Sequence, residues 1–355
     1  MSVVKFSEVA HRANTKEDRF NTDKIYYVGG EHIEPGELFI HDKGFIKGST
    51  IGPMFYCGFK SGQILFVTRN PHLRKCSVAE FDGICSDKTF VIETIDKRIL
   101  LQEYLASVML SDDFWNYCEE NKSGGVNYFL NWSTLADYEF ELPSVEEQKA
   151  ISDKVWAAYR LKESYKKLLA ATEEMVKSQF IEMFGDPVSW QTDTSLPTLN
   201  DTVNVISGFP FDSEKFDTEG VGTPLIRIRD IQRGYSETFT TEVFDEQYRI
   251  KKYELLVGMD GMFDIARWQS DEAALNQRVC CLRMKGSEND TFIQYLVQPI
   301  LKHIENGTNA TTVKHISTKQ INGIRVPIAS HEQKNKFAMI ANQADKSGFR
   351  TQQIH

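Results

Sequence analysis

Basic and amide side chains occur in three short clusters that could contact nucleic acid. Arg and Gln form paired hydrogen bonds with the edges of guanine and adenine, and Lys neutralises phosphate. Strand periodicity would place Arg227 and Arg229 on one face. For each residue, a solvated surface charge or a salt bridge is the simpler interpretation. The clusters are Arg69, Arg74 and Lys75, then Arg227, Arg229 and Arg233, then Arg267 and Gln269 in a predicted loop.

Two small polar loops, at residues 123–127 and 308–312, could approach phosphates through backbone N–H groups. The candidate residues in and beside these loops are Asn127, Thr308 and Lys314. The alternative is that both loops are exposed turns between a helix and a strand.

The overall charge opposes a simple nucleic-acid interface. The chain of 355 residues has a net charge of −9, and no segment forms a basic domain. Phosphate contacts need Lys and Arg, so a positive surface must be local or must come partly from partner subunits.

Catalytic and metal-binding patterns are incomplete. Asn70-Pro71-His72-Leu73 lacks the second proline and the aromatic residue of an amino-methyltransferase loop. His331-Glu332 begins like a zinc-protease helix, but Asn335 stands where the second histidine is required. There is no P-loop, no Cys-x-x-Cys pair and no apolar run of membrane-spanning length. We therefore expect a non-enzymatic cytoplasmic protein with reduced cysteines, without a metal site and without a membrane partner.

The elements that must position these candidates occur twice. Residues 131–143 align with residues 315–327 at an offset of 184, and Glu147-Gln148-Lys149 recurs as Glu332-Gln333-Lys334 after one inserted residue. The alternative is that each segment is simply the end of a strand followed by a capped helix. That would explain each segment separately, but not the spacing that the two copies share. The pattern therefore indicates a tandem duplication.

The repeat predicts an α+β protein in four parts. Two mixed α/β regions, 1–143 and 187–327, alternate with a helix at 144–186 and a second helix at 328–355. Ser144 and Glu147 fit a capping box, and apolar residues at spacings of three and four follow. Such a long amphipathic helix needs a helical partner, so we expect the two helices to form an antiparallel coiled coil. The second helix looks truncated.

These motifs resemble those of type I restriction–modification specificity subunits. The resemblance is carried by Leu142–Lys149 with its helix, by Val326–Lys334, by Gly258–Asp264 with Leu275–Arg278, and by residues 344–352. It covers nearly the whole chain. The first globular region lacks the opening that Gly208–Asp230 provides in the second.

The resemblance implies a function as well as a fold. Each globular region would be a target-recognition domain that reads half of a split sequence in double-stranded DNA, and the helices would set the spacing. Two methyltransferase subunits and the restriction subunits would dock on this frame. S-adenosylmethionine, ATP and Mg²⁺ would be used by those partners, with no cofactor on this chain. The helix and subunit-interface positions are Pro143, Glu147, Gln148, Pro327, Glu332 and Gln333.

Two other hypotheses fit part of the sequence. The chain could be the recognition fragment of a fused restriction–methyltransferase enzyme, which would require it to bind S-adenosylmethionine. It could also be a coiled-coil scaffold that does not contact DNA.

Overall fold

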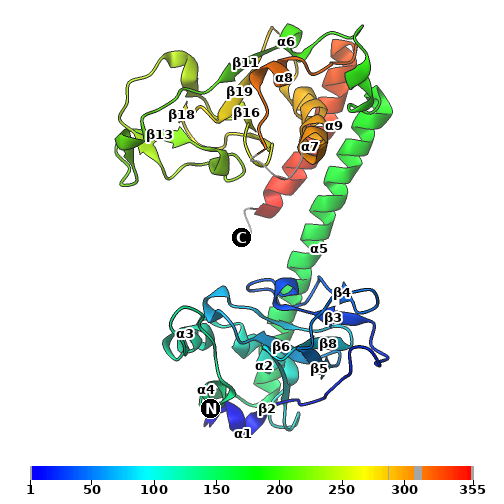
Figure 1. Ribbon diagram of the computed structural model, residues 1–355, viewed down its shortest axis with the longest axis vertical. Helices are drawn as coiled ribbons and strands as arrows, with labels where there is room; N and C mark the ends of the chain where they lie inside the picture. The colour runs from blue at the N-terminus through cyan, green and yellow to red at the C-terminus, as the bar shows by residue number, and fades with distance from the viewer. Residues whose placement is uncertain (1, 287, 308–313, 353–355) are drawn as a thin grey trace. The chain divides into compact units, whose positions relative to one another are not determined.

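The computed structural model describes residues 2–286, 288–307 and 314–352. The chain forms two compact units, Met1–Ser164 (unit 1) and Tyr165–His355 (unit 2). The division falls inside the long helix α5 (Val145–Phe184), so each unit contains one portion of that helix (Figure 1).

Unit 1 contains two four-stranded sheets and one two-stranded sheet. The four-stranded sheets have the orders β2-β9-β6-β7 and β4-β3-β8-β5, and β1 pairs with β10. The strands are β1 (Ser2–Lys5), β2 (Ala10–Arg12), β3 (Tyr26–Val28), β4 (Gly44–Phe45), β5 (Phe55–Phe59), β6 (Ile64–Val67), β7 (Cys76–Val78), β8 (Gly83–Ser86), β9 (Thr89–Thr94) and β10 (Glu139–Leu142). The helices before α5 are α1 (Phe6–Val9), α2 (Gln102–Met109), α3 (Asp112–Glu120) and α4 (Trp132–Ala136).

Unit 2 contains a four-stranded sheet, β11-β19-β16-β17, and a five-stranded sheet, β12-β14-β13-β18-β15. The strands are β11 (Val203–Ser207), β12 (Phe216–Asp217), β13 (Thr223–Ile226), β14 (Phe239–Thr240), β15 (Arg249–Ile250), β16 (Leu255–Gly258), β17 (Ile265–Arg267), β18 (Ala273–Leu275) and β19 (Val279–Met284). The helices after α5 are α6 (Leu199–Thr202), α7 (Asp290–Gly307), α8 (Thr318–Asn322) and α9 (His331–Gln352).

The two units repeat one topology. The order β2-β9-β6-β7 corresponds strand for strand to β11-β19-β16-β17. The second sheets each contain one parallel pair, β3 with β8 and β13 with β18, flanked by antiparallel neighbours. This agreement confirms the duplication that the sequence predicts, and the fold is α+β with two sheet-rich regions and long helices.

Large aromatic residues fill the core of unit 1. The central strand β6 is buried along its whole length, as expected for a strand covered on both faces. Phe66 on β6 stacks on Trp115 of α3, with ring centroids 5.6 Å apart, and meets Phe114 edge to face. The side chain of Ser111 accepts a hydrogen bond from Phe114 N and so caps α3.

Helix α5 begins and ends where the sequence predicts. The Glu147 carboxylate accepts hydrogen bonds from Ser144 N and Oγ, and Glu147 N donates to Ser144 Oγ, which completes the capping box. At the other end, Gly185 has a φ of +89° and Trp190 lies where a β-carbon would point. This left-handed position favours glycine and ends the helix.

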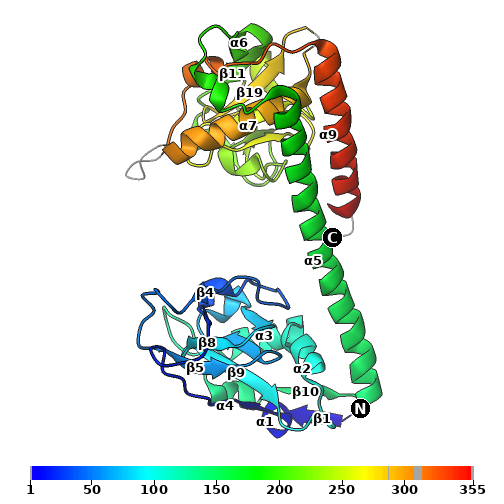
Figure 2. The same ribbon diagram turned by 90° about the vertical axis from the view of Figure 1, so that its right-hand side faces the viewer.

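Within unit 2, α9 packs on the C-terminal portion of α5 and runs in the opposite direction (Figure 2). Phe180 and Phe184 of α5 both contact Phe337 near the start of α9, with ring centroids 5.1 and 5.9 Å apart. Phe292 of α7 stacks on Phe180 at 5.4 Å. The predicted antiparallel helix pair is thus confirmed in unit 2, with α9 of 22 residues against 40 in α5.

The predicted alignment of the repeat at an offset of 184 is wrong by two residues in its C-terminal part. Phe6 N donates to Tyr138 O, and Leu199 N donates to Ile324 O, so the structural offset is 324 − 138 = 186. The same offset relates α4 to α8. The sequence alignment matched Pro143 with Pro327. The fold instead matches the buried side chains, because burial fixes which residues must face the core.

All six cysteines are free and buried. Cys280 and Cys281 lie on β19, and burial raises the pKa of Cys280 to about 12. Among the residues that the structure describes, no helix is long and apolar enough to cross a membrane.

Candidate nucleic-acid interface

The predicted strand through Arg227 and Arg229 ends earlier than expected. Strand β13 stops at Ile226, because Arg227 N donates to the Asp230 carboxylate at 2.9 Å and a 3-10 turn, Ile228–Asp230, begins there. The two arginines therefore do not share a strand face. Arg229 is exposed, and its Nη2 donates to Thr238 Oγ1 at 3.1 Å.

Arg227 and Arg229 nevertheless line one pocket of unit 2, of about 970 Å³. Strand β16 leads into it at Asp260, and the turn between β18 and β19 enters it through residues 276–278. Guanidinium and amide groups are the side chains that make paired contacts with bases. The polar lining includes Arg227, Arg229, Gln232, Asn276, Gln277 and Arg278.

The turn that carries Arg278 lies directly against the main chain that follows β11. Gly208 N donates to Val279 O at 3.0 Å, and Phe209 N donates to Leu275 O at 2.8 Å. A β-carbon on Gly208 would lie 2.0 Å from Asn276 O. Only glycine allows this approach, so backbone contacts position the turn.

Arg278 is fixed by a carboxylate at the edge of this pocket. Its Nε lies 3.3 Å from Asp260 Oδ2, and Asp260 Oδ1 lies 2.5 Å from His315 Nδ1. Arg278 belongs to a motif that the sequence shows, but the sequence does not show that Arg278 contacts Asp260, or that Asp260 contacts His315, because these residues are far apart in the chain. The repeated topology is the signal that could have indicated this cluster.

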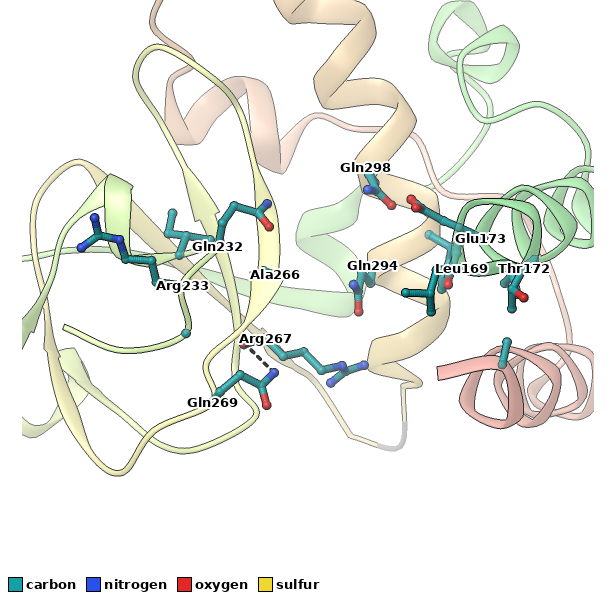
Figure 3. A pocket seen from close by; sticks show the side chains of 15 residues that line it. Leu169, Thr172, Glu173, Gln232, Arg233, Ala266, Arg267, Gln269, Gln294 and Gln298 are labelled. Carbon is teal, nitrogen blue, oxygen red and sulfur yellow. Dashed lines mark hydrogen bonds between the residues drawn. The ribbon is translucent and has the colours of Figure 1, made fainter. Parts of the chain in front are cut away.

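A second pocket of unit 2 holds Arg233, Arg267 and Gln269 together with residues of α5 and α7 (Figure 3). The prediction that Arg267 lies in a loop is wrong, because Arg267 is the last residue of strand β17. Its guanidinium contacts the Asp290 carboxylate and donates to Thr291 Oγ1 at 3.0 Å. Burial acts to raise the pKa of Asp290, but the hydrogen bond and charge of Arg267 outweigh it and lower the pKa below its ordinary value. Arg267 thus joins β17 to α7.

The other candidates of this pocket and of the neighbouring loop are largely held within the unit. Exposed Arg233 pairs with Glu237 at 3.4 Å, and Gln269 Nε2 donates to Arg267 O at 3.0 Å. Lys314 Nζ donates to Glu305 O at 2.6 Å. Thr308 lies outside the described residues.

Unit 1 places its candidates around one turn. Arg69 is exposed, with its guanidinium carbon 5.4 Å from the centre of the Phe129 ring. Arg74 pairs with Asp112 at 2.6 Å, and Lys75 Nζ donates to Gly30 O at 2.6 Å. Asn127 is exposed in the loop that the Ser123–Phe129 bridge closes. Arg69 and Asn127 are therefore the freest candidates in this unit.

The predicted interface positions on the helices have different structural roles. Gln148 is fully buried: its Oε1 accepts from Leu101 N, and its Nε2 donates to Ile99 O and to Pro143 O, at 2.9, 2.9 and 3.0 Å. Its counterpart at offset 186 is Lys334, which pairs with Glu288 at 2.8 Å. Each helix is thus fixed to its own unit by the first buried polar side chain after its cap.

The remaining interface candidates belong to the caps or to the surface. The Gln333 side chain accepts from Ser330 N and Oγ and completes a capping box that matches Ser144 and Glu147. Glu332 is exposed in the first turn of α9. Pro143 is buried, whereas Pro327 is half-buried and lies two residues before the position that corresponds to Pro143 in the repeat. A contact of these positions with another subunit stays a prediction.

Gln148→Leu is expected to lower the free energy of unfolding of unit 1 by about 2–3 kcal/mol, because leucine removes three hydrogen bonds that the buried amide makes to the main chain. Urea unfolding of the full chain, followed by the fluorescence of the unit 1 tryptophans, measures this. Lys149→Ala is the control, since it removes only an exposed pair with Asp153 and should change stability by less than about 0.5 kcal/mol. Equal effects of the two substitutions would contradict the anchoring role.

One group of possible metal ligands occurs among the described residues. Glu37, His41 and Glu163 place ligand atoms within 4.8 Å of one another. Lys162 Nζ lies 2.9 Å from Glu37 Oε1, and His41 Nε2 lies 3.2 Å from Glu163 Oε2. These ion pairs already attach α5 to unit 1.

A family model and a curated relative each match part of the chain. Residues 193–353 match the family model of the type I restriction modification DNA specificity domain. The chain is 33% identical over 162 residues to the type I restriction enzyme EcoBI specificity subunit of Escherichia coli, a match that spans 44% of this chain and only 34% of that protein.

Two solved structures share the fold over nearly the whole chain. The S subunit of a type I restriction-modification system from M. genitalium has a TM-score of 0.57 at 15% identity, covering 99% of this chain and 91% of that one. A chain from a structural study of complex assembly and conformational transition of the type I R-M system has a TM-score of 0.51 at 18% identity, covering 99% and 92%. At these identities the likeness concerns the fold alone.

Proposed function

Because residues 193–353 match the type I restriction modification DNA specificity domain and the chain has a relative among such specificity subunits, we propose that this chain is a type I specificity subunit that reads the DNA target of its complex. Unit 1 and unit 2 would each contact one half of a split sequence in double-stranded DNA. The observation that carries this proposal is the repeated topology, with an exposed arginine near the same bridge in each unit, Arg69 and Arg278.

The boundaries 1–143, 144–186, 187–327 and 328–355 would separate target domains from helices. Arg227, Arg229 and Asn127 are the further DNA candidates that keep accessible positions. The helices α5 and α9 would hold the spacing between half-sites and receive two methyltransferase subunits, and the restriction subunits would join this frame.

Chemistry would reside in the partner subunits. The chain would supply no catalytic group and bind no cofactor, while the partners use S-adenosylmethionine, ATP and Mg²⁺ in the cytoplasm. The net charge of −9 supports this division, because a chain with more acidic than basic residues should hold phosphates weakly on its own. The methyltransferases would add positive surface around the DNA.

Footprinting of the full chain together with its methyltransferase partners tests the proposal. We expect protection of one bipartite sequence, and weaker binding as salt rises because condensed counterions are released. No protection at low salt would leave the scaffold hypothesis instead. Calorimetric titration of the chain alone with S-adenosylmethionine should give no heat of binding, whereas saturable binding would favour a fused enzyme.

A further inference from the structure

The same backbone bridge occurs in both units and carries different side chains. Arg69 bridges Phe129 in unit 1, and Asp260 bridges His315 in unit 2. The flanking hydrogen bonds also correspond, with Leu130 N to Thr68 O and Ile316 N to Met259 O both 2.9 Å long. The fold is therefore constant here, and the side chains differ.

In unit 2 the bridge organises a polar cluster. Asp260 contacts both His315 and the Nε of Arg278. The Asp260 side chain is 20% exposed, whereas that of Arg278 is 56% exposed. Asp260 thus forms the base of the cluster, and Arg278 is the side chain that a ligand in the pocket could reach.

The contact with Asp260 determines which part of Arg278 is available. The atoms of the ion pair that lie 3.3 Å apart are Arg278 Nε and Asp260 Oδ2, and no hydrogen bond within the described residues engages Nη1 or Nη2. Two parallel N–H donors match the O6 and N7 acceptors of guanine in the major groove. Holding one end of the guanidinium also reduces the side-chain entropy lost when the other end binds.

We propose that Arg278 is a specificity-determining residue that reads guanine through Nη1 and Nη2, and that Asp260 is its positioning residue. The inference rests on the proposed function. A phosphate is the less suitable ligand, because the Asp260 carboxylate would repel a second anion placed against the same guanidinium. A base edge carries no net charge and escapes this repulsion.

The duplication provides a matched control. Lys88, in the turn before β9, occupies the place of Arg278, and it lies 3.2 Å from Asp87. Arg69 occupies the place of Asp260. Substitution of Arg69 therefore changes the corresponding position in the other unit and should affect only the half-site that unit 1 reads.

The experiment selects bound molecules from a library of DNA duplexes with a randomised centre, using the full chain with its methyltransferase partners. Wild-type, Arg278→Ala, Asp260→Asn and Arg69→Ala complexes are compared. With Arg278→Ala, preference for guanine at one position should fall about 5- to 150-fold, the range for one bidentate contact. Asp260→Asn should weaken the same preference less, because asparagine keeps an acceptor but loses the charge. Arg69→Ala should change only the other half-site.

Other outcomes separate the two levels of the argument. If the wild-type complex enriches no sequence, the proposed function is wrong and the inference fails with it. If a split motif appears but Arg278→Ala weakens all sequences equally and lowers the salt slope by about one, Arg278 contacts phosphate and only the inference is wrong. Changes by Arg278→Ala and Asp260→Asn in different half-sites would also overturn it.

Discussion

Phe180→Ala is expected to lower the free energy of unfolding of unit 2 by about 3–5 kcal/mol. Phe180 is 2% exposed and lies where three helices meet. Its ring stacks on Phe292 of α7, meets Phe337 of α9 edge to face and contacts Phe184 at 5.0 Å. Alanine would leave a cavity that rigid helices cannot close, and would also remove the favourable aromatic geometry.

Thermal unfolding of the full chain by calorimetry measures this loss, with the transition of unit 2 identified by hydrogen exchange in α7. Ile181→Ala is the control, because the neighbouring side chain is 50% exposed and alanine favours the helix. We expect the control to unfold within a degree or two of wild type. Comparable losses at the two positions would show that α9 does not depend on the aromatic contact.

Lys334→Met is expected to destabilise unit 2 by about 3–5 kcal/mol, because it leaves the Glu288 carboxylate buried without its counterion. The two side chains are only 7% and 14% exposed and are joined at 2.8 Å. The Lys334 ammonium also lies 5.2 Å from the centre of the Phe292 ring. The pair fixes the first turn of α9 to the segment before α7.

A double-mutant cycle with Glu288→Met separates the pair from general damage to the core. Replacement of both partners by apolar residues should recover most of the loss, because the desolvation cost disappears together with the attraction. Urea unfolding of the four proteins gives the coupling energy. Losses that simply add would rule out a buried pair of this strength.

The periodic elements could be predicted from the sequence because local rules decide them. Ser144, Glu147 and Gly185 define the ends of α5, close to the limits of the helix predicted at 144–186. The duplication was also visible, since it preserves the order of strands and helices. The register of the repeat was predicted incorrectly, because the sequence alignment was set by the identity of Pro143 and Pro327 and not by the buried residues.

The candidate site was predicted only in part, because long-range contacts decide which arginines are free. Arg267 looked available in the sequence but is held by Asp290 on α7. Arg278 was not among the predicted candidates, because the cluster around it forms only in the folded chain. Two other members of that cluster, Asp260 and His315, lie 55 residues apart in the sequence. Gln148 belonged to a recognised motif, yet its complete burial shows an internal anchor that no motif distinguishes from a docking residue.

The contact between Gly208 and the Asn276 carbonyl has an evolutionary consequence. Main-chain atoms hold the turn, so we expect the side chains at positions 277 and 278 to contribute little to the stability of unit 2. Substitutions at these two positions should therefore change the DNA that is read more than they change the stability of unit 2. Gly208 itself should tolerate no replacement in any lineage that keeps this turn.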